Sequence, residues 1–398
     1  MVSVALARKV ERRRKKTAAR THKHQTRADI LVALAGDSKR ARPMSEVGAF
    51  RAVPTDLTSL NRAATVGGVP ISCTWLIHGP SGGGKTALLI AMMKAFVKAG
   101  GLAAFIDAEM SADTRRWIRQ LGLDTQSVLY VGRTGEEDTE PLTYEVVVDE
   151  VDGIMGRYKL GKREGWIAPG TPLIVGVDSI SRMVPAGLMK RMAKDGAKAL
   201  RSGYGREQAN MNKVWLAELG TKVGDDDILF AVIAHELEKE SKNAWSADYK
   251  VRGGAALIYD AMMQVRVEFA GQVRDLAKEK DGPSTPAVGK RHSALLLKNK
   301  HGPAFSRATF YTSNGQGLAP VGFDRVREVL HEAIQRGIVE GPEPKEMTAG
   351  SRFKWKGRTM TLKQFYKKPE LAEVIDLIAR ELDADLIEEL NGKSGDSP

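Results

Sequence analysis

The stretch Gly79-Pro80-Ser81-Gly82-Gly83-Gly84-Lys85-Thr86 decides the fold. It matches the phosphate-binding loop pattern of a glycine, four residues, and then Gly-Lys followed by Ser or Thr. An apolar run (74–78) precedes it and a helical pattern (87–98) follows, which is the context such a loop needs. Glycines let backbone N–H groups wrap around phosphates, and a helix N-terminus adds partial positive charge. We therefore expect all eight residues to bind ATP, with Lys85 on the β and γ phosphates and Thr86 on Mg²⁺.

The chain around this loop predicts an α/β domain. From about Asp56 to Tyr311, apolar runs alternate with helical patterns. The clearest runs are 74–78, 102–106, 173–177, 228–234, 262–267 and 294–297. Nearly continuous apolar runs are typical of strands that helices cover on both faces. We therefore predict a mostly parallel central sheet flanked by helices.

Carboxylates follow two of these runs. Asp178 comes directly after run 173–177 and is expected to hold Mg²⁺, directly or through water. A helix N-cap is the alternative role for this carboxylate. Asp107 and Glu109 end run 102–106, at the sheet edge where ligands bind in such folds. Either could be a structural cap, and Glu109 is the candidate general base that activates the attacking water.

The positive charge is concentrated in the N-terminal region. The 398 residues include 61 Lys and Arg against 49 Asp and Glu, a formal excess of +12. Residues 1–51 hold 14 Lys or Arg and 4 Asp or Glu, so +10 of this excess lies there. The basic residues between Arg8 and Arg27 predict a solvated arm that binds nucleic acid or a partner, or only keeps the chain in solution.

Several classes of protein are not expected. No window approaches 18 consecutive apolar residues, so we expect no membrane span. The N-terminal residues lack the pattern of a signal peptide, and a lone Cys73 permits neither an internal disulfide nor a cysteine zinc site. A reducing, cytoplasmic location is therefore expected.

From about Thr58 to Glu389, the chain resembles the RecA-type recombinase family, and particularly its bacteriophage members. Besides the phosphate loop, the resemblance rests on ordered blocks at 59–70, 105–109, 177–180, 253–257 and 297–305, and on the segment 366–390. It implies a basic N-terminal arm with a short polymerisation segment (1–55), a RecA-like P-loop ATPase core (56–318) and a small α+β C-terminal domain (319–398). Helical stretches at about 322–336 and 370–390 flank a strand-like segment, 353–360, in that last part.

The resemblance also implies roles that spacing does not show. In this family ATP lies between adjacent protomers of a helical filament, and a glutamate at the position of Glu109 activates the hydrolytic water, which favours it over Asp107. Lys298 and Lys300 match a pair that reaches the neighbour's phosphates, and two lysines two apart on a strand share a face. Trp117, with Asp113 close by, is near the position that stacks on adenine; a buried helix tryptophan is the alternative.

DNA contact in the family comes from two loops. The expected contacts are Lys190, Arg191, Lys194, Lys198, Arg201 and Arg206 in the first, and Lys239, Lys242, Trp245, Lys250 and Arg252 in the second. An exposed amphipathic helix is the alternative for the first stretch. Basic residues interleaved with aromatics suit single-stranded DNA. Where the family has a glutamine that senses the γ-phosphate, this chain has His235, which can still donate a hydrogen bond but would couple the switch to pH.

The sequence thus predicts an ATP-dependent DNA recombinase, that is, a DNA-stimulated ATPase that forms filaments on single-stranded DNA and pairs it with a homologous duplex. Expected partners are single- and double-stranded DNA, further copies of the chain, and single-strand-binding or loader proteins. Two other classes stay open: a hexameric helicase or packaging motor with the same core, and a catalytically quiet mediator that uses the fold as a scaffold.

Overall fold

The structure is a computed structural model that describes residues 51–109, 118–132, 142–196, 204–224, 227–238, 249–275 and 286–395. The basic arm lies outside these ranges. The described residues form one compact unit. Within the described ranges, no helix has both the length and the apolar character needed to cross a membrane.

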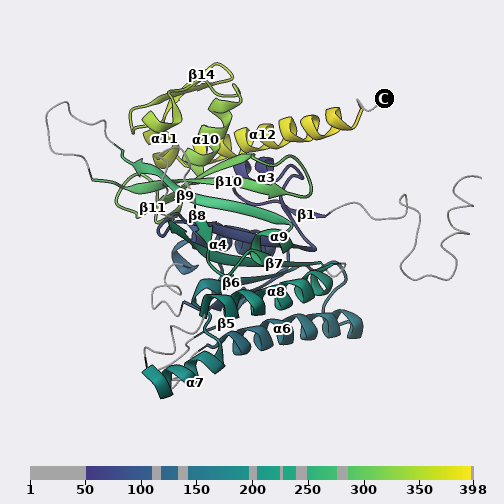
Figure 1. Ribbon diagram of the computed structural model, residues 1–398. Coiled ribbons are helices and arrows are strands. Elements are labelled where there is room, and N and C mark those ends of the chain that lie inside the picture. The colour runs from purple at the N-terminus through teal and green to yellow at the C-terminus, as the bar shows by residue number, and fades with distance from the viewer. Residues whose placement is uncertain are drawn as a thin grey trace, which may run out of the picture. The chain divides into compact units, whose positions relative to one another are not determined.

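A large mixed sheet forms the centre of this unit (Figure 1). Its strands, in spatial order, are β12 (Gly322–Phe323), β11 (Arg307–Ser313), β10 (Gly289–Asn299), β9 (Met263–Val273), β3 (Cys73–Gly79), β7 (Ile228–Glu238), β6 (Leu173–Asp178), β4 (Leu102–Asp107) and β5 (Val128–Val131). In this order, neighbouring strands pair in parallel through β9, β3, β7, β6, β4 and β5. Neighbouring strands pair antiparallel through β12, β11, β10 and β9. All six apolar runs fall on strands, so the predicted α/β fold is confirmed.

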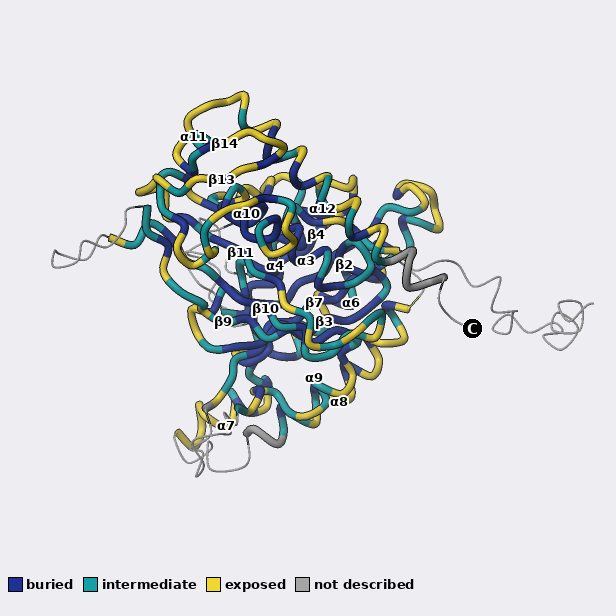
Figure 2. Tube along the Cα trace, turned by 90° about the horizontal axis from the view of Figure 1, so that it is seen from above, coloured by how far each residue is buried: buried dark blue, intermediate teal, exposed yellow. Residues whose placement is uncertain are grey.

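Helices cover both faces of the sheet because its strands are apolar on both faces. On β3, Trp75 and Ile77 belong to the core cluster that includes α4 (Lys85–Lys98), whereas Leu76 belongs to the cluster that includes α6 (Tyr144–Glu164) and α8 (Tyr204–Val223). This alternation is the two-residue period of a strand. Figure 2 shows the resulting concentration of buried residues along β3 and β7.

Shorter elements complete the core region. They are β1 (Ala52–Val53), α3 (Thr58–Ala63), β2 (Val69–Pro70), η3 (Thr125–Ser127), η4 (Ile180–Arg182), α7 (Ala186–Asp195), β8 (Tyr249–Val251) and α9 (Ala256–Asp260). β1 pairs with β2, and β8 pairs antiparallel with the end of β7.

The C-terminal region has a hydrophobic core of its own. It contains α10 (Arg325–Gln335), η6 (Pro344–Glu346), β13 (Arg352–Trp355), β14 (Arg358–Thr361), α11 (Leu362–Lys367) and α12 (Glu370–Gly395). The segment 353–360, expected as one strand, is a hairpin of β13 and β14. The chain reverses at Lys356 and Gly357, which both have positive φ angles, and such a turn is not visible in an alternating pattern. The domain limits at 55 and 318 stay predictions.

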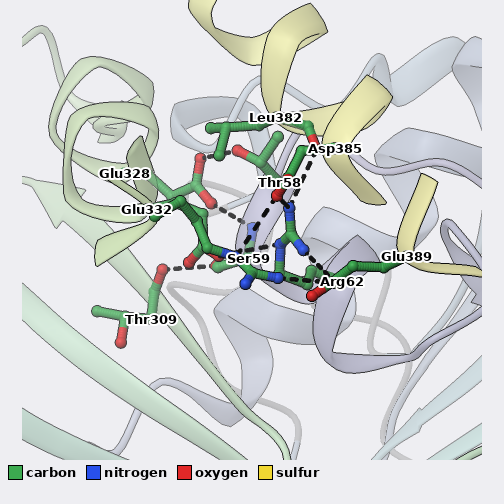
Figure 3. Close-up of polar contacts among 10 residues, drawn as sticks. Thr58, Ser59, Arg62, Thr309, Glu328, Glu332, Leu382, Asp385 and Glu389 are labelled. Atoms are coloured by element: carbon green, nitrogen blue, oxygen red, sulfur yellow. Dashed lines mark hydrogen bonds and ion pairs between the residues drawn. The ribbon is translucent and has the colours of Figure 1, made fainter. Parts of the chain in front are cut away.

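A polar cluster joins α3 to this C-terminal region (Figure 3). The Arg62 guanidinium lies 2.6 Å from carboxylate oxygens of both Asp385 and Glu389 on α12, and 3.2 Å from Glu332 on α10. The buried Glu328 carboxylate accepts hydrogen bonds of 2.8 Å from the Thr58 hydroxyl and the Ser59 N–H. The Arg62 contacts are charged hydrogen bonds, which are among the stronger ones in proteins, so they hold α3 against α10 and α12.

Candidate functional site

The glycine-rich loop leaves the carboxyl end of β3 and opens α4. Gly79, Gly82 and Gly84 have φ angles of 145°, 71° and 104°, values that side-chain-bearing residues rarely adopt. A Cβ atom on Gly79 would collide with the carbonyl oxygen of Val267 on β9, and one on Gly84 would lie 2.5 Å from the ring of His292. Glycine is therefore required here for two reasons: the backbone adopts positive φ angles, and the loop packs closely on β9 and β10.

Lys85 folds back over the loop. Its ammonium group donates to the carbonyl oxygens of Gly79 and Pro80, at 3.0 and 2.8 Å. Burial lowers the pKa of Lys85, and the charges of Asp178 and Glu109 partly oppose this effect. The lysine thus lies inside the loop with acidic groups around it, and its role on the phosphates stays a prediction.

The two expected Mg²⁺ ligands contact each other. The Thr86 hydroxyl donates to Oδ2 of Asp178 over 2.5 Å. Burial raises the pKa of Asp178 to about 6, although the bond from Thr86 opposes the rise. Hydroxyl and carboxylate oxygens suit Mg²⁺. No group of three or more His, Cys, Asp or Glu side chains that could hold a metal occurs in the described part of the chain.

Glu109 lies beside this pair at the carboxyl edge of the sheet. Its N–H donates to the carbonyl oxygen of Asp178 over 3.0 Å, and this bond holds the two backbone segments together. Oε1 of Glu109 lies 2.5 Å from Nε2 of His235 and accepts a hydrogen bond of 3.2 Å from the Ser179 hydroxyl. The bond from His235 lowers the pKa of Glu109 and outweighs the opposing effect of burial. The carboxylate is therefore ionised at neutral pH. Asp107, the other candidate, accepts a hydrogen bond from Tyr130.

His235 stands where β7 runs out toward the second predicted loop. Its N–H donates to the Ser181 hydroxyl at 2.9 Å, and its carbonyl accepts from the N–H of Arg252, next to β8. The side chains of Lys250 and Arg252 are exposed beside it. The end of β7 thus contains His235, which contacts Glu109, and lies beside the exposed basic residues Lys250 and Arg252.

The first predicted DNA stretch is partly helical. Residues 186–195 form α7, in which only Leu188 is buried, so this part of the stretch is an exposed helix, and its contact with DNA stays a prediction. Lys190, Arg191 and Lys194 lie on it, and Arg191 pairs with Glu207 of α8 at 2.5 Å. Because Glu207 partly neutralises the Arg191 guanidinium, Arg191 would attract a DNA phosphate less strongly.

The lysine pair departs from the expected geometry. The ammonium of Lys298 donates to the carbonyls of Ile258 and Tyr259 at 3.2 and 2.8 Å. β10 ends at Asn299, and its register with β9 shifts between Leu296 and Lys298. Lys300 therefore lies beyond the strand, and the expectation that both lysines share one face of a regular strand is wrong. Their proposed role does not depend on that regularity.

Several expected site residues lie outside the described residues. They are Asp113, Trp117, Lys198, Arg201, Lys239, Lys242 and Trp245, and the side chain of Arg206 belongs with them. Their roles stay predictions.

Three contributors were not predicted. Ser179 and Ser181 orient Glu109 and His235 through their hydroxyls, as described above. His292 on β10 lies under the loop, where its Nδ1 donates to the Gly83 carbonyl at 2.7 Å. Burial lowers the pKa of His292 to about 4, so the ring is neutral. The serines follow Asp178 closely and could have been noticed, whereas nothing local marks His292.

The comparisons with known proteins agree with this geometry. The family model described as the RecA N-terminal domain matches residues 41–155. Protein RecA of Chloroherpeton thalassium is 28% identical over 288 residues, which cover 72% of this chain and 69% of that protein. Protein RecA of Thermus aquaticus is 26% identical over 329 residues (81% and 83%), and that of Mycolicibacterium smegmatis is 25% identical over 338 residues (85% and 82%). These relatives leave the expected bacteriophage origin a prediction. The phosphate loop, its two strand-end carboxylates and these matches together support a RecA-type recombinase.

Proposed function

We propose that the chain binds and hydrolyses ATP, assembles on single-stranded DNA and exchanges that strand with a homologous duplex. The observation that carries the proposal is the contact between His235 and Glu109. It connects the strand that leads to a proposed DNA loop with the carboxylate proposed to activate water. A change at the DNA surface can therefore reach the site of hydrolysis directly, as a DNA-stimulated ATPase requires.

Each side chain has a part in the hydrolysis. Lys85 neutralises charge on the β and γ phosphates, for which it must leave the carbonyls of Gly79 and Pro80. Glu109, ionised and held by Ser179 and His235, orients the attacking water and accepts its proton. The loop N–H groups and the N-terminus of α4 stabilise the phosphate charge.

The described residues fit a nucleotide with Mg²⁺. Thr86 and Asp178 offer the oxygens that this ion prefers, and they already lie within hydrogen-bond distance. When bound there, Mg²⁺ would supply charge neutralisation at the phosphates. The adenine side of the site, expected from Trp117 and Asp113, is a proposal from the resemblance alone.

The partners follow from the exposed basic surfaces and the family. Lys190, Lys194, Lys250 and Arg252 are proposed to meet DNA phosphates, whose contacts weaken as salt rises. Lys298 and Lys300 are proposed to reach a nucleotide on the neighbouring copy in a filament. Single-strand-binding or loader proteins are further proposed partners, and a cytoplasmic location agrees with this function.

A homologous strand-exchange assay tests the proposal. It uses purified full chain with ATP, with a non-hydrolysable analogue or without nucleotide, and the Lys85→Ala variant as a control. We expect exchange with either nucleotide and none without it. ATP turnover with closed rings and duplex unwinding would instead indicate a motor. DNA binding without turnover or exchange would indicate a mediator.

A further inference from the structure

A buried carboxylate stands next to His235 on β7. Oε1 of Glu236 lies 2.7 Å from Nδ1 of His78, and both side chains are almost fully buried. On the other side of the ring, the amide nitrogen of Gln264 lies 2.9 Å from Nε2 of His78. An amide nitrogen only donates, so Nε2 accepts and Nδ1 donates its proton to Glu236. The sequence reasoning assigned no role to these three residues.

Arg266 on β9 holds the same carboxylate from a second direction. Its Nε and one terminal nitrogen donate to the two oxygens of Glu236 at 2.9 and 3.2 Å, and its other terminal nitrogen donates to Glu268 at 2.6 Å. The guanidinium also lies 4.7 Å from the ring centre of Tyr249. The ring centres of Tyr249 and His78 are 5.6 Å apart. Burial alone would raise the pKa of Glu236, but the bonds from His78 and Arg266 lower it.

This group of residues touches the phosphate loop. His78 directly precedes Gly79, and Val267 follows Arg266 on β9. A Cβ atom on Gly83 would lie 2.5 Å from the carbonyl oxygen of Val267, so β9 forms the floor on which the loop rests. The charge of Glu236 also acts on Lys85 and raises the pKa of that lysine against the effect of burial. A displacement of Glu236 would therefore disturb the packing under the loop or change the pKa of Lys85.

The same residues also touch the proposed DNA surface. Tyr249 begins β8, and Glu236 lies opposite Val251 of that strand, one position from the Leu237 and Lys250 pair. Successive residues of a strand point to opposite faces. His235 therefore reaches Glu109 on one side, while Glu236 reaches His78 and Arg266 on the other.

We propose that Glu236 is a positioning residue that transmits DNA contact at β8 to the phosphate loop, through its hydrogen bonds to His78 and Arg266. This inference rests on the proposed DNA-stimulated ATPase. It adds a second route to the one through His235, and it acts on the loop that holds the phosphates rather than on the water. Coupling between two sites is typically worth a factor of about 5 to 150.

The test measures ATP turnover with and without saturating single-stranded DNA for wild type, Glu236→Gln and Glu268→Gln. Glutamine keeps the shape of Glu236 but removes the charge that Arg266 binds. We expect DNA stimulation to fall about fivefold or more, chiefly through kcat at saturating DNA, while the Kd for DNA changes by less than about twofold. Glu268→Gln, which weakens a bond to the same arginine but none to His78, should keep most of the stimulation.

Arg266→Lys is the second variant, because lysine keeps the charge but cannot bind a carboxylate through two nitrogens. It decides the matter if Glu236→Gln does not fold, and it should reduce stimulation in the same way. Wild-type stimulation in the folded variants would overturn the inference, and so would a decrease of equal size in Glu268→Gln. A wild-type chain that DNA does not stimulate would instead contradict the proposed function.

Discussion

Nε2 of His235 lies 2.5 Å from Oε1 of Glu109, although the two residues are 126 positions apart in the chain. Glu109 follows β4 and His235 lies on β7, and both strands pair in parallel with β6, so residues at their carboxyl ends meet at one edge of the sheet. The bond lowers the pKa of Glu109 and directs its carboxylate. This contact thus connects the proposed DNA surface near His235 with the carboxylate proposed to activate water.

Glu109→Gln should stop hydrolysis while nucleotide binding remains. Glutamine fits the space and can stay bonded to Ser179 and His235, but it cannot accept the proton from water. Turnover should fall about 10²- to 10⁴-fold. Single-turnover hydrolysis and equilibrium binding of a fluorescent ATP analogue measure the two effects. Glu340→Gln, a change at an exposed carboxylate, is the control. Loss of ATP binding would mean that Glu109 is structural.

His235→Leu should reduce DNA-stimulated turnover about tenfold, because leucine cannot bond to Glu109. His235→Gln should keep most of the stimulation, since its amide group can donate to the same oxygen. Steady-state ATPase assays across a series of DNA concentrations distinguish a lower maximum from weaker DNA binding. If the two variants behave alike, the hydrogen bond has no part in the coupling.

Lys85→Ala should abolish ATP turnover, since the lysine is the cation closest to the loop carbonyls and would meet the phosphates. Lys98→Ala, at the other end of the same helix and exposed, is the matched control and should behave as wild type. Turnover and thermal unfolding are measured together so that a folding defect is recognised. A Lys85→Ala protein with wild-type turnover would refute the nucleotide site.

Deleting residues 1–27 should flatten the salt dependence of DNA binding. This segment contains 10 Lys or Arg, and each phosphate that the shortened chain no longer neutralises makes the negative slope of log K against log salt shallower by about 0.9 for duplex DNA. Fluorescence anisotropy between low and moderate salt measures the slope. An unchanged slope would mean that the arm does not touch phosphates.

Local composition is enough to predict β3, β4, β6, β7, β9 and β10, but not β5, β8, β11 or β12. A strand buried on both faces is mostly apolar, so β3 and β6 are predictable, and the carboxylate that ends β6 lies at the expected edge of the sheet. The departure at Lys300 depends on where pairing with β9 stops, which no local pattern contains. His78, Glu236 and Arg266 meet only because β3 lies between β7 and β9. Strand order, rather than sequence spacing, creates that group.

Glu328→Gln should stabilise the fold at neutral and higher pH. Burial raises the pKa of Glu328 from its ordinary value of 4.5 to about 7, although its bonds to Ser59 and Thr58 oppose the rise (Figure 3). The folded chain therefore binds this proton more tightly than the unfolded chain. As pH rises from 4.5 to 7, the wild type loses stability from this group, on the order of 1 kcal/mol per pH unit. Glutamine can bond to both partners and carries no charge at any pH.

The advantage of the variant should therefore grow between about pH 5 and 7 and stay constant above that range. Urea unfolding at pH 5, 6, 7 and 8 measures the free energy of unfolding of both proteins. Glu340→Gln is again the control, because that exposed carboxylate should leave the pH profile unchanged. An advantage independent of pH would show that Glu328 stays ionised in the fold. A loss of stability at every pH would show that its charge is needed to hold α3 against α10.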